Sequence, residues 1–292
     1  MGNIHGRCGH HHAPAAHHVH FVAGAIHARI CAYGGKVKIV GHKGGGSSVP
    51  ENSRAALKHA LSLGLDAVEI DIWPTADRRF VLFHDADIAR LTGHAGWTMH
   101  LTSDQLRTLE IGSRVSTEYA GERILLLEEA LDLLAGKADL FLEVKRTRHE
   151  LERYTWVEER LSQILHDCDA MAWTTVISFD HRSLLNLQET SHDVRLGMLY
   201  AGEWLSLEQE MEALNPVALL PHWAQTTPTL VNNTHSRGIS IYPWVVNNDE
   251  WMQEFSHMGV DGIITDRPEA LIRLQQARGR PTNKMEAEGS HD

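Results

Sequence analysis

Two carboxylates and two histidines between residues 38 and 85 have the types and spacing of a catalytic site. Glu69 and Asp71 lie two residues apart on an apolar run, so both side chains point to the same face of a predicted strand. Two carboxylates on one face repel each other unless a cation or a proton lies between them. His42 and His84 each end a similar run, and histidine exchanges protons near neutral pH. The stretch therefore predicts acid–base chemistry beside a metal ion.

Other predicted strands also end in polar residues. Glu143 and Lys145 end the run DLFLEVK, and a third carboxylate completes a set of oxygen ligands that suits Mg²⁺ or Ca²⁺ better than zinc. Lys43 and Lys145 are candidates to hold phosphate oxygens. The alternative is that Glu69 and Asp71 pair with basic residues in a structural network. The remaining polar residues at predicted strand ends are His222, Trp244 and Asn247.

Alternating strand and helix patterns explain how residues so far apart in the sequence can meet. Apolar runs of strand type occupy residues 37–41, 67–72, 80–83, 139–145, 175–179, 195–200, 217–221, 240–246 and 262–265. Predicted helices occupy residues 54–63, 103–109, 127–134, 149–166, 181–189, 207–214, 228–237 and 249–258, and a last one follows Pro268. This alternation predicts an α/β fold, a (β/α)8 TIM-type barrel, whose active site lies at the carboxyl ends of the strands.

The pattern is irregular at the link between the second and third predicted strands. That link is shorter than the roughly dozen residues that a parallel crossover needs, so we expect a tight turn there. One of the nine strand candidates is then surplus to an eight-stranded barrel. We also expect an inserted region at about residues 86–126, after the third strand, within a barrel domain that spans residues 37–278.

Composition limits the classes of function. The chain has 292 residues, with 27 Lys and Arg against 38 Asp and Glu and a formal net charge of −11, which argues against a nucleic-acid partner. Its three cysteines, Cys8, Cys31 and Cys168, are few and far apart, so we expect no disulfide framework. This pattern favours a reducing compartment, and we expect the cytoplasm. No apolar run approaches the roughly 20 residues of a membrane-spanning helix, so no stable membrane insertion is expected. The oligomeric state has no signature in the sequence.

The two ends of the chain differ from the rest. Residues 1–36 hold eight of the 21 histidines and show no helix or strand periodicity, so we expect a disordered leader. A tract so rich in histidine can also bind transition metals, which is the alternative. Residues 279–292 are a polar tail that we expect to fray.

Taken in order, the motifs resemble those of the glycerophosphodiester phosphodiesterase family. The stretch GHKGGGSSVPENS is similar to the family's His-Arg-Gly…Pro-Glu-Asn-Thr opening. The segments AVEIDIW, VLFHD, YAGERILLLEEALDLL, FLEVK, YPWVVNN and GIITDRP follow in the family's order, so the resemblance runs from about residue 38 to 274. It implies a TIM-type barrel with an insertion after the second histidine.

The resemblance also implies a role for each matching residue. It implies that Glu69, Asp71 and Glu143 bind a divalent cation and that His42 and His84 are the acid–base pair. Lys145 would contact the substrate, Trp244 would line the mouth of the pocket, and Glu51 and Asn52 would brace the loop behind His42. One departure concerns Lys43, because the family has Arg there and lysine lacks the planar two-point contact with phosphate.

The implied activity is metal-dependent hydrolysis of a glycerophosphodiester to glycerol phosphate and an alcohol, which belongs to lipid and glycerol metabolism. A lysophospholipase D or sphingomyelinase D type of lipid phosphodiesterase would use the same chemistry and is the first alternative. A barrel that binds phosphodiesters without turning them over is an alternative of another class. The core motifs do not separate these three hypotheses.

Overall fold

The computed structural model describes residues 36–146 and 155–278. Residues 1–35 and 279–292, to which the predicted leader and tail belong, lie outside the described residues, so both assignments stay predictions. The same holds for residues 147–154, where the predicted helix 149–166 would begin.

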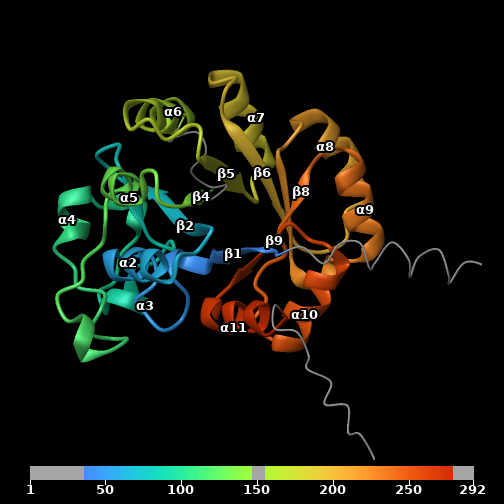
Figure 1. Cartoon of the computed structure of the whole chain (residues 1–292). Helices are drawn as coiled ribbons and strands as arrows, with labels where there is room; N and C mark the ends of the chain where they lie inside the picture. Colours follow the sequence, from blue (N-terminus) through green and yellow to red (C-terminus); the bar gives the residue numbers. More distant parts are fainter. Residues whose placement is uncertain (1–35, 147–154, 279–292) are drawn as a thin grey trace, which may run out of the picture.

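Among the described residues, eight parallel strands form the wall of a barrel (Figure 1). In order around the sheet they are β8 (Ser240–Ile241), β7 (Ala218–Pro221), β6 (Arg195–Tyr200), β5 (Thr174–Ser178), β4 (Asp139–Val144), β2 (Ala67–Pro74), β1 (Lys38–Gly41) and β9 (Gly262–Thr265). Backbone hydrogen bonds link the β8 and β9 segments: Asp261 N donates to Ile241 O at 3.1 Å and Ile264 N to Pro243 O at 3.1 Å. These bonds nearly close the barrel, and the predicted fold class is confirmed.

The surplus strand is β3 (Phe80–Leu82), which pairs antiparallel with β2 outside the barrel wall. Thr75 and Arg79 close the connection, because Thr75 N donates to Arg79 O at 2.9 Å. Five residues allow only such a turn. The predicted irregular link is therefore confirmed, and β3 leads directly to His84.

Helices lie around the strands (Figure 1). They are α2 (Arg54–Leu63), α5 (Leu127–Leu134), α6 (Val157–Asp167), α7 (His181–Thr190), α8 (Leu207–Leu214), α9 (Pro228–Ser236), α10 (Asp249–Met258) and α11 (Pro268–Arg278). Local chemistry fixes their ends: the Ser53 hydroxyl accepts from Ala56 N at the start of α2, and Gly64 ends it with φ 64°. None of the helices among the described residues has both the length and the apolar character needed to cross a membrane.

Several predicted element boundaries differ from the structure by one or two residues, and two were wrong for a clear physical reason. Within the described residues α6 begins only at Val157, because Trp156 forms a turn and the acidic residues Glu158 and Glu159 suit the first turn of a helix. β8 is shorter than the predicted 240–246, because Pro243 has no N–H to donate and the ladder ends before it.

The stretch predicted as an insertion, 86–126, packs its own small core against β3. It contains α3 (Ala89–Thr92), α4 (Ser103–Arg107) and the short 3-10 helices η2 (Thr98–His100) and η3 (Thr117–Tyr119). Thr102 caps α4 and Gln105 completes a capping box. The apolar residues that fill this core include Phe83, Ile88, Leu106, Ile111 and Ile124.

A separate apolar cluster fills the inside of the barrel and sets the floor of the site. Its members include Val40, Ala67, Phe141, Ile177, Leu220, Tyr242 and Ile264. Side chains two positions apart on a strand point the same way. The residues two positions further along these strands therefore lie above the floor, at the carboxyl ends: His42, Glu69, Glu143, Phe179, His222, Trp244 and Asp266.

Candidate active site

Three buried carboxylates meet above the floor of the barrel. β2 and β4 are neighbours with Asp71 paired to Glu143, and Glu69 precedes Asp71 on the same face of β2. The three side chains offer oxygen atoms that all lie within 4.8 Å of one another. The relative exposures of Glu69, Asp71 and Glu143 are only 3%, 1% and 7%. The structure therefore brings together all three carboxylates that the sequence pattern singled out.

Two neighbours satisfy part of this acidic group. Lys145 Nζ lies 2.9 Å from Asp71 Oδ1 and 2.7 Å from Glu143 Oε1. The buried Asn52 donates from Nδ2 to Asp71 Oδ2 at 2.8 Å and accepts from Asp71 N at 3.0 Å. Lysine pairing is the contact that the structural-network alternative expects, but it reaches only two of the three carboxylates.

The pKa values show that one lysine does not balance the group. Burial, with added repulsion from Asp71 and Glu143, raises the pKa of Glu69 well above its usual range. Burial and Asp71 also raise the pKa of Glu143 to about 7. Burial works against ionisation of Asp71 too, but Lys145, His84 and Asn52 outweigh it and lower the pKa of Asp71. A further cation near Glu69 and Glu143 would remove this electrostatic penalty.

The residues present fit a divalent cation. Glu69 Oε1 is buried and makes no hydrogen bond to the described residues, and a buried charged oxygen without a partner is costly. Hard cations such as Mg²⁺ and Ca²⁺ prefer oxygen ligands. Together with the close approach of the three carboxylates, the orphaned oxygen marks the point where a cation would bind.

His42 lies beside this acidic group at the end of β1. It begins the 3-10 helix η1 (His42–Gly44). Its Nδ1 is 2.6 Å from Asp266 Oδ1, and its Nε2 is 3.9 Å from Glu69 Oε2. Asn247 Nδ2 donates to the other oxygen of Asp266 at 2.7 Å. An acceptor on Nδ1 places the proton there and leaves Nε2, on the side of the carboxylates, to exchange protons.

His84 has the same kind of partner at the end of β3. Its Nδ1 lies 2.7 Å from Asp85 Oδ1, and Trp73 Nε1 donates to its backbone carbonyl at 3.0 Å. Phe83 N donates to Asp71 O at 3.1 Å, so His84 follows a residue that is bonded to the strand of the carboxylates. Both predicted histidines thus carry a carboxylate on Nδ1 and follow backbone that is bonded to β2.

The loop after His42 ties Lys43 into the site. The backbone of Lys43 has φ 52°, and its N–H donates to Glu69 Oε2 at 2.9 Å. Lys43 O accepts from Asn52 N at 2.8 Å, and Lys43 Nζ lies 3.5 Å from Glu51 Oε2. Glu51 and Asn52 therefore lie directly behind the loop, next to the residue that departs from the family pattern.

The opposite arc of the mouth, over β5 to β8, is aromatic. Trp244 Nε1 donates to Leu220 O at 2.8 Å, which fixes the ring above the floor. The Trp244 ring lies edge-on to Phe179, with centroids 5.4 Å apart, and to His222, with centroids 5.2 Å apart. The mouth thus has an ionic side and an aromatic side.

Four residues of this site were missed from the sequence, and one of them is Asp85, which directly follows the predicted His84. Asp266 follows β9 directly, so the rule that selected polar residues at strand ends could have found it. Phe179 stands at the end of β5 and was passed over because only polar residues were considered. Arg90 contacts Asp85 and Glu51, but it lies in the predicted insertion, where no periodicity predicts its position.

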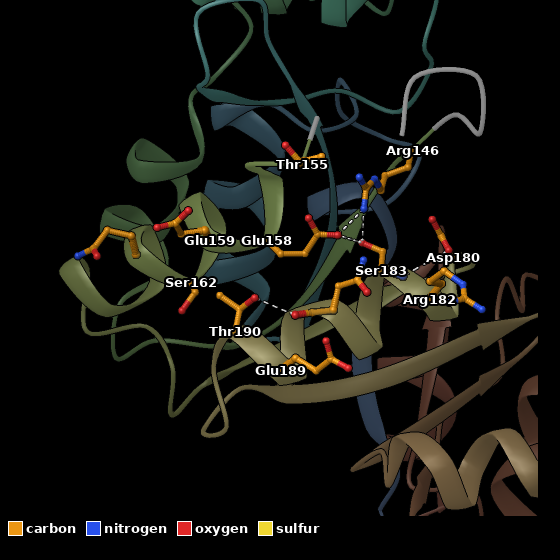
Figure 2. A pocket seen from close by; sticks show the side chains of 12 residues that line it. Arg146, Thr155, Glu158, Glu159, Ser162, Asp180, Arg182, Ser183, Glu189 and Thr190 are labelled. Carbon is orange, nitrogen blue, oxygen red and sulfur yellow. Dashed lines mark hydrogen bonds and ion pairs between the residues drawn. The ribbon is translucent and has the colours of Figure 1, made fainter. Parts of the chain in front are cut away.

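A groove outside the barrel was not predicted at all. It measures about 780 Å³ and is lined by residues of α6 and α7, and the predicted site residues are not among the described residues that line it (Figure 2). Arg146, Glu158 and Ser183 point toward one another there, and Ser183 Oγ donates to Glu158 Oε1 at 2.9 Å (Figure 2). These contacts tie the end of β4 to α6 and α7, which is a structural role.

Comparison with known proteins points to one family. The sequence model of the glycerophosphoryl diester phosphodiesterase family matches residues 42–270. A glycerophosphodiester phosphodiesterase of Caldanaerobacter subterraneus subsp. tengcongensis is 30% identical over 244 residues, which cover 84% of this chain and 100% of that protein. A second relative, a putative glycerophosphodiester phosphodiesterase of Bacillus subtilis, is 29% identical and covers 80% of this chain and 96% of its own length.

Solved structures share the fold. The putative glycerophosphoryl diester phosphodiesterase of Silicibacter pomeroyi superposes with a TM-score of 0.77 at 24% identity, over 83% of this chain and 94% of that one. A phosphodiesterase of Oleispira antarctica, solved in complex with the product sn-glycerol-3-phosphate, has a TM-score of 0.75 at 22% identity, over 82% and 96%. Both likenesses extend across the barrel.

Proposed function

This chain belongs to the glycerophosphoryl diester phosphodiesterase family and hydrolyses glycerophosphodiesters, and from that premise we propose how its residues carry out the reaction. Glu69, Asp71 and Glu143 hold a divalent cation, Mg²⁺ or Ca²⁺. His42 and His84 serve as the acid–base pair. The observation that carries the proposal is the arrangement itself: three buried carboxylates meet at one point, and two histidines, each with a carboxylate on Nδ1, follow the neighbouring strands β1 and β3.

The phosphate has to be bound by a protein that is acidic overall. When bound, the divalent cation supplies positive charge that stabilises the phosphate oxygens as negative charge builds up on them. Lys43, whose backbone N–H binds Glu69, and Lys145, whose ammonium contacts Asp71 and Glu143, offer ammonium groups for the remaining oxygens. These contacts place the phosphate on the ionic side of the mouth.

The histidines move the protons. The carboxylates of Asp266 and Asp85 hold the proton on Nδ1 of His42 and His84 and fix the direction of each ring. One Nε2 takes the proton of the nucleophile, which is water or the glycerol hydroxyl, and the other histidine gives a proton to the leaving alcohol. The products are glycerol phosphate and the alcohol. Because the two surroundings are alike, the geometry permits either assignment of acid and base.

The direct test is kcat for release of glycerol phosphate from glycerophosphocholine. His42→Ala and His84→Ala should each lower kcat by about 100-fold or more, the scale of lost acid–base catalysis. His166→Ala is the matched control, because this histidine is half exposed on α6, and it should keep the wild-type rate. A normal kcat in either site variant would show that the acid–base assignment is wrong. Tight binding of the substrate without turnover by the wild type would support the binding-barrel alternative.

A second candidate is a lipid phosphodiesterase of the lysophospholipase D type, and one observation favours it. Phe179 is 44% exposed at the aromatic side of the mouth. It also lines a neighbouring groove of about 620 Å³, where Leu185 and Trp204 stand among charged residues such as Arg182 and Glu210. The exposed Phe179 ring is an apolar contact that an acyl chain could use and that a free head group would leave unused. Rates on lysophosphatidylcholine and glycerophosphocholine, compared at equal concentration, would separate the two substrates.

The proposal extends to location. Few and scattered cysteines favour a reducing compartment, and we take the cytoplasm as that compartment. Recovery of the protein in the cytoplasmic fraction of fractionated cells would support this part, and recovery with membranes or in the medium would contradict it.

A further inference from the structure

Arg90 connects the two loops that carry the proposed histidines. It lies on α3, within the predicted insertion. Its Nε donates to Asp85 Oδ2 at 2.5 Å. Its other two nitrogens bind Glu51, with Nη2 to Oε1 at 2.5 Å and Nη1 to Oε2 at 3.1 Å. One guanidinium therefore bridges the segment after β3 and the segment after β1.

The first branch of this bridge reaches His84. Asp85 accepts from His84 Nδ1 through one oxygen and from Arg90 through the other. A carboxylate bound at both oxygens cannot rotate without breaking a charge-assisted hydrogen bond. The direction of the His84 ring, and so the position of its Nε2, depends on the place of Arg90.

The second branch reaches Lys43. Glu51 makes two bonds to Arg90 and only one longer contact, 3.5 Å, to Lys43 Nζ. The flat guanidinium matches both oxygens of a carboxylate, which an ammonium does not. Arg90 thus balances most of the charge of Glu51, and the ammonium of Lys43 stays available to another anion.

We propose that Arg90 is a positioning residue for the reaction: it orients His84 through Asp85 and frees Lys43 for the substrate phosphate through Glu51. This inference rests on the proposed roles of His84 and Lys43. It also gives the predicted insertion a part in building the site, since Arg90 lies there and its side chain contacts both loops.

A merely structural surface ion pair is the competing explanation. Arg90 has a side-chain exposure of 48%, and exposed pairs usually contribute little. Two features set this one apart. Arg90 contacts both oxygens of Glu51. The side chains of Glu51 and Asp85 are only 19% and 27% exposed, so removal of Arg90 would leave two largely shielded carboxylates without this cation. The competing explanation predicts a change in stability alone.

The test replaces Arg90 by methionine and measures kcat and KM separately on glycerophosphocholine. Loss of the first branch should lower kcat about tenfold, and loss of the second should raise KM about tenfold, the scale of one charge-assisted hydrogen bond each. Arg107→Met is the matched control, because Arg107 lies in the same insertion, is 40% exposed and pairs with Glu129 at 2.9 Å. It should leave both constants within twofold of the wild type.

A second substitution separates the branches. In Arg90→Met/Glu51→Gln the unbalanced charge next to Lys43 is gone, so KM should return toward the wild-type value while kcat stays low. Arg90→Lys keeps a charge for folding but cannot span both carboxylates, so at most one constant should recover. Circular dichroism and the thermal midpoint are measured for every variant.

Three results would overturn the inference. They are kcat and KM within twofold of the wild type in Arg90→Met, recovery of both constants in Arg90→Lys, and a KM in the double variant as high as in Arg90→Met. If Arg90→Met does not fold, the Arg90→Lys result decides alone. Turnover by the wild type is measured first, so a wild type without activity would count against the proposed function and not against Arg90.

Discussion

Binding of a divalent cation should depend on pH far more steeply than ordinary carboxylates would allow. Burial and the neighbouring Asp71 raise the pKa of Glu143 to about 7, from an ordinary value of 4.5. A protonated carboxyl does not bind a cation, so binding must displace the proton. The sign follows: affinity falls as the pH drops through the raised pKa, because protons and the cation compete for Glu143.

The change in Kd with pH distinguishes a raised pKa of Glu143 from an ordinary one. With a pKa of about 7, the apparent Kd should rise about tenfold between pH 6 and pH 5 for the proton on Glu143 alone. With the ordinary pKa of 4.5, the same change would be about 1.3-fold. Glu69, whose pKa is raised well above its usual range by burial, can only steepen the dependence.

The assay is isothermal titration calorimetry with Mg²⁺ and with Ca²⁺ at the two pH values. Repeating each titration in buffers of different ionisation enthalpy counts the protons released. Glu143→Gln should bind more weakly but with a shallower dependence on pH, because the amide has no proton to lose. A Kd that is the same at pH 6 and pH 5, with no proton released, would refute the electrostatic reasoning. Absence of binding at either pH would show that this site does not bind the cation.

Three further changes test other parts of the account. Lys43→Arg should lower KM for glycerophosphocholine by about two- to tenfold, because the guanidinium contacts phosphate at two points. Glu158→Ala should cost about 3–5 kcal/mol in urea unfolding, because it leaves Arg146 without one partner of a buried ion pair. Partial burial raises the pKa of Asp77, but hydrogen bonds from Thr75 and Ser103 outweigh it and lower that pKa below 3.8. Asp77→Asn should therefore cost about 1 kcal/mol of unfolding free energy at pH 7, and this cost should disappear as the pH falls below 3.8.

Each of these has a result that contradicts it. A higher KM in Lys43→Arg would mean that the added guanidinium pairs with Glu51 and does not reach phosphate. Glu159→Ala is the control for Glu158→Ala, since Glu159 is exposed on the same helix. Equal losses of unfolding free energy in the two variants would mean that the buried ion pair does not stabilise the fold. If Asp77→Asn loses the same stability at pH 7 and below the pKa of Asp77, the loss comes from changed packing and not from the lost charge.

Strand periodicity made most of this site predictable. Glu69 and Asp71 could be assigned to one face because the side-chain period of a strand is two, and the structure sets both on β2 with Glu143 beside them. The irregular link before β3 followed from its length alone. Family motifs then supplied the substrate class, which periodicity does not contain.

The pairing of one side chain with another was not predictable in this way. Asp266 and Asp85 matter because each accepts from a histidine, and which carboxylate meets which ring depends on distances across the mouth. Arg90 is harder still, because its position depends on how the insertion folds against β3, and no repeating pattern governs that packing. The early end of β8 at Pro243 could have been read from the sequence, since proline offers no N–H to a ladder.

The central claim is that this barrel releases glycerol phosphate from glycerophosphodiesters with a cation held by Glu69, Asp71 and Glu143. One measurement addresses it most directly: a panel of glycerophosphodiesters is assayed for released glycerol phosphate with Mg²⁺ or Ca²⁺, and again after treatment with a chelator. We predict release with the cation, loss of activity with the chelator, and recovery when the cation is restored. Full activity in the chelator would contradict the role of the carboxylates, and no release from any member of the panel would contradict the function.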